Sequence, residues 1–183
     1  VRGGGENERY SVGFNYFDQY GTAEFNRYQR GTVRVNTDFN VGRLTVGENL
    51  SVAMDEHYGG MPFDPGGYAE DGILGKNILM SPIIPVRDIA GNYASSKGPL
   101  QGNQTNPLKR AEQGRDTRYR NLRVFGNGFA NLALTDALTA NTSLGINAGE
   151  GATRGFNPIT PENSEPNLIN SIFEDSNYFT SYT

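Results

Sequence analysis

Apolar and polar side chains alternate along several stretches of the chain, the first of which is RYSVGFNYFDQYG. On an extended chain, one side of this stretch carries Tyr10, Val12, Phe14 and Tyr16, and the other side carries small or polar residues. A period of two is typical of a β-strand with one apolar face. The pattern therefore predicts a strand over about residues 10–18.

Four further segments alternate in the same way, over about residues 27–41, 43–55, 118–135 and 138–150. Each has about ten residues or more, whereas strands in soluble domains commonly have about five or six. The sequence thus predicts an all-β fold built from long antiparallel strands. Residues expected on the outer, apolar face are Tyr10, Val12, Phe14, Tyr16, Val33, Val35, Phe39, Leu132, Leu134, Leu144 and Ile146.

The connections between these segments alternate between long and short. About ten residues join the first two segments, NVGR joins the second to the third, some 60 residues follow, and TDA joins the last two. Outer-membrane β-barrels sort their connections in this way, with short periplasmic turns and longer extracellular loops. The pattern favours a barrel segment with a long extracellular loop over about residues 56–117 and a further loop over about residues 151–177.

The opposite face of the predicted strands is polar. Unpaired polar groups are costly in a dry core, whereas a water-filled lumen accommodates them. We therefore expect this face to line a lumen and to take part in substrate binding. The candidate residues are Arg34, Asn36, Asp38, Arg123, Asn127 and Asn131.

Glu48 does not fit this division, because it falls on the apolar face of the third segment. A charge at the middle of a membrane costs free energy. Either Glu48 lies near the periplasmic interface, or the predicted register of this strand is wrong.

The long loop combines a helical pattern with turn signals. In GYAEDGILGKNILMS the apolar residues cluster at helical spacing, which predicts a short helix. In SPIIPVRDIAGNYA an extended segment between two prolines precedes a turn at Asp88 and Gly91. Long loops with their own structure are usually lids or binding loops. We expect this one to pack over a barrel mouth or a partner protein.

Aromatic residues of the loop, Tyr58, Phe63, Tyr68 and Tyr93, allow two interpretations. Either they stack on the rings of a sugar substrate, or they pack within the loop, as aromatic side chains generally do. His57 is the single histidine. It lacks partners at metal-ligand spacing, so we expect a solvated loop residue with no catalytic or metal-binding role.

Composition narrows the class of protein. The formal charge of −4 and the isoelectric point near 5.0 argue against a nucleic-acid partner, which requires clustered Lys and Arg. The 183 residues contain no cysteine, so disulfides and thiolate metal sites are excluded, and no motif indicates a cofactor. No run approaches the roughly 18 apolar residues of a membrane helix. Glycine, with 24 residues, and aromatic residues, at 11%, suit strands and turns.

Four stretches carry a family resemblance: RGGGENERYSVGFNYFDQYGTAEFNRYQRGTVRVNTDFNV, SPIIPVRDIAGNYA, NPLKRAE and YRNLRVFGNGFANLALTDALTANTSLGIN. In this order and spacing, over about residues 2–150, the chain resembles part of a SusC/RagA-type TonB-dependent outer-membrane transporter. In that family a Gly-rich lead-in precedes an early barrel strand, a PIIPVYD-NGNY-like segment and NP lie in a long loop, and an R-FGN-Y strand follows. At the position of Glu48 in the third segment, the family pattern leads us to expect a small or uncharged residue, so Glu48 departs from it.

The resemblance implies about five strands of a barrel of about 22 strands. It further implies a longer protein, with a plug domain and a TonB box outside these residues, located in the bacterial outer membrane. Members import large nutrients, typically oligosaccharides or peptides, with energy from the TonB complex. A SusD-like surface lipoprotein is the implied partner, and a dimer of such pairs is the implied assembly.

Two other classes of function remain as alternatives. A secreted β-rich carbohydrate-binding or adhesin module would need the apolar faces of the five segments to meet in one core. A glycoside hydrolase would need two carboxylates flanking a cleft, and the sequence selects no such pair. We therefore expect a protein that is not an enzyme.

Overall fold

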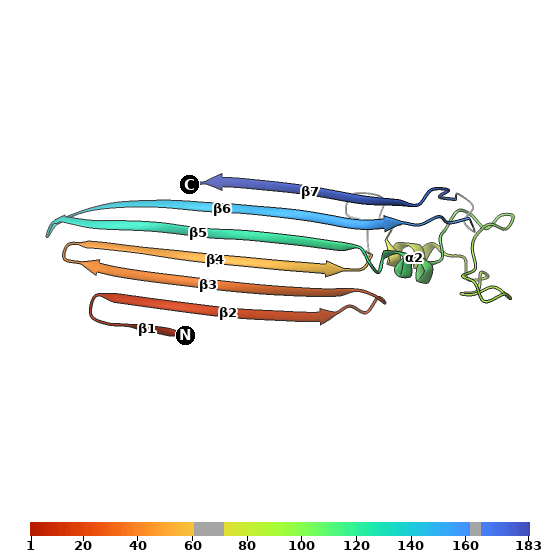
Figure 1. Ribbon diagram of the computed structural model, residues 1–183, viewed down its shortest axis with the longest axis horizontal. Coiled ribbons are helices and arrows are strands. Elements are labelled where there is room, and N and C mark those ends of the chain that lie inside the picture. The colour runs from red at the N-terminus through yellow and green to blue at the C-terminus, as the bar shows by residue number, and fades with distance from the viewer. Residues whose placement is uncertain (61–71, 162–165) are drawn as a thin grey trace.

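A single antiparallel sheet with its strands in sequence order forms most of the computed structural model, which describes residues 1–60, 72–161 and 166–183 (Figure 1). Its elements are β1 (Arg2–Gly4), β2 (Glu8–Tyr20), β3 (Arg27–Val41), β4 (Leu44–Tyr58), α1 (Ile73–Leu79), α2 (Pro107–Gly114), β5 (Arg118–Thr135), β6 (Leu138–Asn157) and β7 (Ser171–Tyr182). The all-β, antiparallel prediction is confirmed. The sheet has seven strands and is not closed into a barrel.

The strands extend further than the sequence pattern indicated. The further loop predicted over residues 151–177 is wrong, since β6 continues to Asn157 and β7 begins at Ser171, and the two pair over that length. In β6, Glu150 and Arg154 fall on the apolar face and Gly149 and Gly151 on the other, so apolar and polar side chains do not alternate and the pattern marks no strand there. The long loop likewise begins after Tyr58, because β4 pairs with β3 up to that residue.

Short and long connections lie at opposite ends of the sheet, as predicted (Figure 1). At the short-turn end, two residues join β3 to β4, and one of them is Gly42 with φ of 61°. Glycine adopts this left-handed conformation without steric cost. The β2–β3, β4–β5 and β6–β7 connections and both helices gather at the other end, the loop end.

Within the described residues, neither face of the sheet is covered by another layer. Among the described residues, the buried apolar side chains are Ala53, Ile73, Ala94 and Ala111, and only Ala53 lies in the sheet. Phe14, by contrast, is 74% exposed. A sheet ordinarily buries its apolar face against a second layer, so this face needs a covering that the described chain does not supply. No helix in the described ranges is long and apolar enough to cross a membrane.

The loop between β4 and β5 has its own framework, and the short helix predicted for it is confirmed as α1. The predicted turn is also confirmed, because the Asp88 carboxylate accepts hydrogen bonds from the amides of Ala90 (2.8 Å) and Asn92 (2.9 Å). The second helix, α2, was not predicted. It starts with an Asn106 cap followed by Pro107 at the first helical position, which is a recognisable start signal.

Asn106 joins this helix to the turn-bearing segment. Its side-chain oxygen accepts hydrogen bonds from the amides of Leu108 and Lys109, and its Nδ2 donates to the carbonyls of Val86 (3.0 Å) and Ala94 (3.1 Å). Asn106 is 3% exposed. One buried side chain therefore fixes the geometry between α2 and residues 86–94.

Candidate functional site

The strand register sorts the side chains of the sheet onto two faces, because directly paired residues of neighbouring strands point to the same side. Val12 pairs with Val35, Val35 with Leu50, Leu50 with Gly126, and Gly126 with Ile146. These residues define the apolar face. All the residues predicted for it lie on it except Leu134, which falls at a register irregularity between Ala133 and Thr135 and has no paired partner.

Glu48 also lies on the apolar face. It pairs with Thr37 on β3 and Gly128 on β5, in a row that begins with Tyr10 on β2. The predicted register of this strand is thus confirmed. Glu48 is exposed and lies four residues from Leu44, where β4 begins at the short-turn end.

The height of the apolar face matches the thickness of a hydrocarbon layer. On β4 it runs from Leu44 to Met54, with Glu48 as its charged side chain, and ten steps of about 3.3 Å each cover about 33 Å along the strand. A tilt of about 40° reduces this span to about 25 Å, the usual height of the apolar band of outer-membrane barrels.

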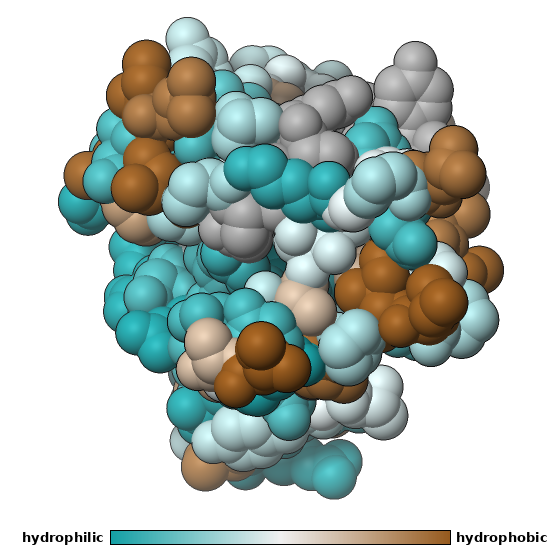
Figure 2. Space-filling model, turned by 90° about the vertical axis from the view of Figure 1, so that its right-hand side faces the viewer, coloured by the Kyte–Doolittle hydropathy of each residue, from teal (hydrophilic) through white to brown (hydrophobic). Residues whose placement is uncertain are grey.

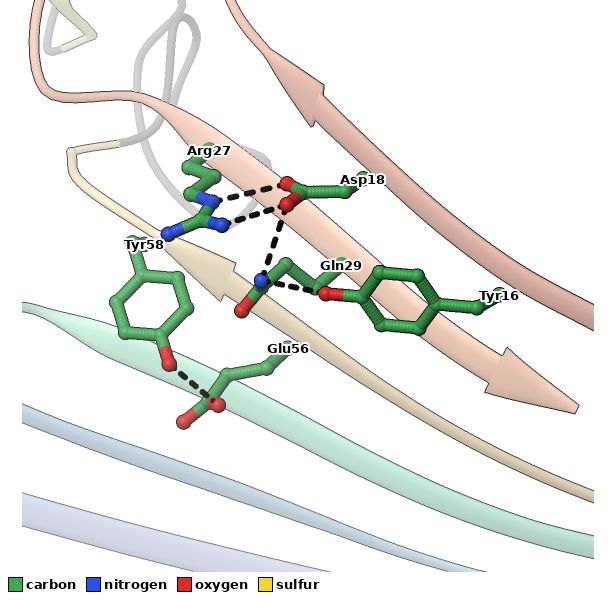
Figure 3. A network of polar contacts seen from close by, with 6 residues as sticks. All are labelled: Tyr16, Asp18, Arg27, Gln29, Glu56 and Tyr58. Carbon is green, nitrogen blue, oxygen red and sulfur yellow. Dashed lines mark hydrogen bonds and ion pairs between the residues drawn. The ribbon is translucent and has the colours of Figure 1, made fainter.

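At the loop end the apolar face gives way to a polar margin, two rows of polar and charged side chains (Figure 3). We define the polar margin as Asp18, Tyr20, Arg27, Gln29, Glu56, Tyr58, Arg118, Arg120, Arg154, Ser176 and Glu174.

Hydrogen bonds link neighbouring strands within the polar margin. Arg27 Nε donates to Asp18 Oδ1 (2.9 Å), and Gln29 Nε2 donates to the Tyr16 hydroxyl (2.8 Å). Within β4, the Tyr58 hydroxyl donates to Glu56 Oε2 (2.6 Å). An exposed ion pair such as Arg27–Asp18 contributes at most about 1 kcal/mol. The main consequence of these contacts is an ordered charged edge next to an apolar surface.

The other side of the sheet is the polar face, and six of the residues predicted to bind substrate lie on it. Arg34, Asn36 and Asp38 follow one another on β3, and Arg123, Asn127 and Asn131 face the same way on β5, with β4 between them. Asn36 is in one row with Asn49 and Asn127. Asn49 Nδ2 donates to Asn127 Oδ1 at 3.2 Å, while Phe125 and Phe129 lie between the polar residues of β5 on the same face.

Further residues of the polar face were not predicted as site residues. Asn121 Nδ2 donates to Asp55 Oδ2 (2.8 Å), and Arg123 Nε donates to Asn147 Oδ1 (3.2 Å). Their position in the alternation was the available signal, since they have the same parity as the predicted residues. On the described strands, amide and charged side chains that hydrogen-bond to one another form an open, mostly hydrophilic wall.

His57 is in β4 and not in a solvated loop, which corrects the prediction. It is half-buried on the polar face, its Nε2 lies 3.0 Å from Asn26 Oδ1, and its ring centroid lies 5.5 Å from that of Tyr119. The described residues hold no group of three or more His, Cys, Asp or Glu side chains able to bind a metal.

The aromatic residues assigned to the long loop lie in different parts of the structure. Tyr58 is the last residue of β4 and belongs to the polar margin, whereas Phe63 and Tyr68 lie outside the described residues. Tyr93 packs within the loop, with the Arg87 guanidinium 4.4 Å from its ring centroid. Burial raises the pKa of the Tyr93 hydroxyl, and the neighbouring Glu112 carboxylate adds to this shift.

An open pocket of about 820 Å³ lies beside this segment. Its lining includes Ile83, Pro85, Arg87, Ile89, Tyr93 and Lys109. Because Arg87 already occupies one face of the Tyr93 ring, only the other face is available for stacking on a ligand.

The loop end presents apolar side chains to the outside. Figure 2 views this end and shows separate hydrophobic patches on a mostly hydrophilic surface. Ile78 and Ile83 are each 75% exposed, and Ile89 and Leu100 are fully exposed. Exposed apolar clusters among polar residues commonly mark sites of protein–protein contact.

Comparison with known proteins finds a similarity among solved structures. No family model matches the chain, and no curated protein matches it. Among solved structures, the chain is similar to one described as the RagAB peptide importer in the 'closed-closed' state, with a TM-score of 0.64 and 25% sequence identity. The similarity covers 90% of this chain and 18% of the other. The chain therefore shares the fold of a small part of an importer assembly, and this likeness suggests a SusC/RagA-like relation.

Proposed function

We propose that this chain forms part of the barrel wall of a TonB-dependent outer-membrane importer of the SusC/RagA type. The apolar face contacts lipid, with Tyr16 near the loop-end interface, and the polar face lines the lumen or the plug. The observation that carries the proposal is the uncovered apolar face, which is of membrane height and is bounded by a polar margin. The similarity to the RagAB importer structure supports the same assignment.

The loop end is on the extracellular side in this proposal, because barrel proteins place their longer connections there. Its exposed apolar residues form the docking surface for a SusD-like surface lipoprotein. TonB supplies the energy through segments outside these residues, and two such pairs assemble into a dimer. The residues of the polar face, Arg34, Asn36, Asp38, Arg123, Asn127 and Asn131, contact the substrate during passage.

Peptides are the favoured substrate class. Amide, carboxylate and guanidinium groups on one wall pair with the backbone and charged ends of a peptide, and the similar importer is described as a peptide importer. Oligosaccharides are the second class.

A secreted binding module is less well supported. It needs the apolar faces of the strands to meet in one core, whereas the described strands place them side by side on an exposed face. No enzyme is proposed, because no pair of carboxylates flanking a cleft is selected by sequence or geometry.

Uptake by whole cells tests the proposed function. We expect deletion of the full-length protein to abolish accumulation of labelled oligopeptides and to leave a labelled amino acid unaffected. We expect complementation with wild type or Val33→Ala to restore uptake, because Val33 lies on the apolar face. Arg34→Ala, its neighbour on the polar face, is expected to restore less. Unchanged oligopeptide and oligosaccharide uptake on deletion would contradict the import function.

A further inference from the structure

Two arginines of the polar margin stand directly opposite each other. Arg118 on β5 pairs with Arg154 on β6. Cβ atoms of directly opposed residues are about 4.5–5.5 Å apart, and like charges in this arrangement are destabilising. Both side chains are exposed. An anion held between the two guanidinium groups would turn this repulsion into attraction.

The nearby carboxylates leave the guanidinium groups of Arg118 and Arg154 available to a ligand. Asp18 and Glu56 are already bonded to other arginines of the polar margin. Glu174 is the register partner of Arg154 on β7, and Glu150 lies on the same face of β6. In the ranges that the structure describes, neither of them forms an ion pair with Arg154.

The aromatic ring of Tyr58 lies against the guanidinium group of Arg118. The guanidinium carbon lies 5.2 Å from the centroid of the Tyr58 ring, and the Tyr58 hydroxyl is fixed by its hydrogen bond to Glu56. Stacking on a ring occupies the flat face of a guanidinium and none of its five N–H donors. Arg118 is thus held in place with donors free for a phosphate, which accepts paired N–H bonds well.

Beyond the polar margin the same face becomes apolar. Towards the short-turn end, β5 carries Leu122 and Val124 beyond Arg120, and β6 carries Ala148 and Ile146 beyond Glu150. Leu122 and Ile146 are each 38% exposed. A ligand that satisfies both parts of this surface needs an anionic head and a hydrocarbon tail.

We infer that Arg118 and Arg154 bind the phosphate of an anionic membrane lipid whose acyl chains lie along Leu122, Val124 and Ile146. This inference rests on the proposed function, since it requires the apolar face to contact lipid. It places an anionic lipid at one position on the barrel wall, where two directly opposed arginines lie close to an apolar surface. Tyr58 acts as a positioning residue for Arg118.

Native mass spectrometry of the full-length protein, purified in detergent from membranes, tests the inference. The probes are phosphatidic acid and diacylglycerol with identical acyl chains, which differ only in the phosphate, and inorganic phosphate alone. We expect retention of phosphatidic acid over diacylglycerol. The double variant Arg118→Gln/Arg154→Gln should weaken phosphatidic acid binding about 30-fold, since each basic residue near an anionic surface adds a few-fold. Arg30→Gln removes a charge at a similar height on the polar face and should leave lipid binding unchanged.

The outcomes separate the inference from the proposed function. Equal retention of the two lipids, or an unchanged affinity in the double variant, overturns the lipid site while the protein still requires detergent. Competition by millimolar inorganic phosphate as strong as that by phosphatidic acid shows a free-anion site and also overturns it. A protein that is soluble without detergent and retains neither lipid overturns the proposed function itself. A melting temperature equal to that of wild type confirms that the double variant is folded.

Discussion

Phe14→Arg is expected to lower the free energy of unfolding of the full-length protein in lipid by about 1–3 kcal/mol. An arginine at the lipid face costs about 2–4 kcal/mol at the membrane midplane and less towards the interfaces, and Phe14 lies in the row of Val52, between the middle of the apolar face and its loop-end border. Phe14 lies on β2 between Tyr10 and Tyr16, and it is 74% exposed within the chain. The substitution removes few contacts within the protein. The change in the free energy of unfolding therefore depends almost entirely on whether lipid or water surrounds the side chain. Equilibrium unfolding in phospholipid vesicles, followed against denaturant concentration, measures it.

Asn15→Arg is the matched control, because Asn15 is adjacent on the same strand and faces the other side. On a water-facing wall this change is expected to alter stability by no more than about 0.5 kcal/mol. If both variants unfold like wild type, or if Phe14→Arg is the more stable, the apolar face does not contact lipid. An exposed apolar residue of a water-soluble module would give that result.

Asn106→Leu is expected to destabilise the loop framework by about 2–4 kcal/mol. It removes the cap of α2, worth about 1 kcal/mol, and it leaves the Ala94 carbonyl without its buried donor, which costs about 1–3 kcal/mol more. Hydrogen exchange over residues 86–114 measures the effect, since protection reports the free energy of local opening. We expect exchange there to accelerate about 30-fold or more, with the strands unchanged.

Asn106→Asp separates the two contributions. The aspartate retains an oxygen that caps the amides of Leu108 and Lys109 but loses the donor to the carbonyls of Val86 and Ala94. We expect intermediate protection, with residues 107–110 more protected than in Asn106→Leu. Equal exchange in wild type and both variants would show that Asn106 does not hold the loop together.

Much of the sheet could be predicted from alternation because each long strand has one apolar side. Even Glu48, which broke the pattern, did not mislead the register: the structure pairs it with Thr37 and Gly128 on the apolar face. Alternation failed where charged side chains fall on the apolar face. The second half of β6, with Glu150 and Arg154 on that face, was taken for loop, although its backbone pairs with β7.

The candidate site was predictable in part. Parity along β3 and β5 placed Arg34, Asn36 and Asn127 on one face, and the hydrogen bond from Asn49 to Asn127 extends that surface. The polar margin was not foreseen, because its rows form only when six strands, β2 to β7, are aligned in register. Tyr58 illustrates this point: it follows His57 in sequence, but its significance comes from Arg118, sixty residues away.

The contrast between the two faces of one strand tests the central claim most directly. Leu144 and Ser143 are neighbours on β6, both are exposed, and they face opposite sides of the sheet. A nitroxide label is attached to Leu144→Cys or to Ser143→Cys in the full-length protein, any other cysteine having been replaced, and the protein is placed in phospholipid vesicles. Molecular oxygen concentrates in lipid and a nickel chelate remains in water, so their collision rates with the label report its solvent. We expect the label at residue 144 to collide more with oxygen and the label at residue 143 to collide more with the chelate. Equal accessibility at the two positions, or the reverse order, would contradict the proposal that this sheet is part of a membrane-embedded wall.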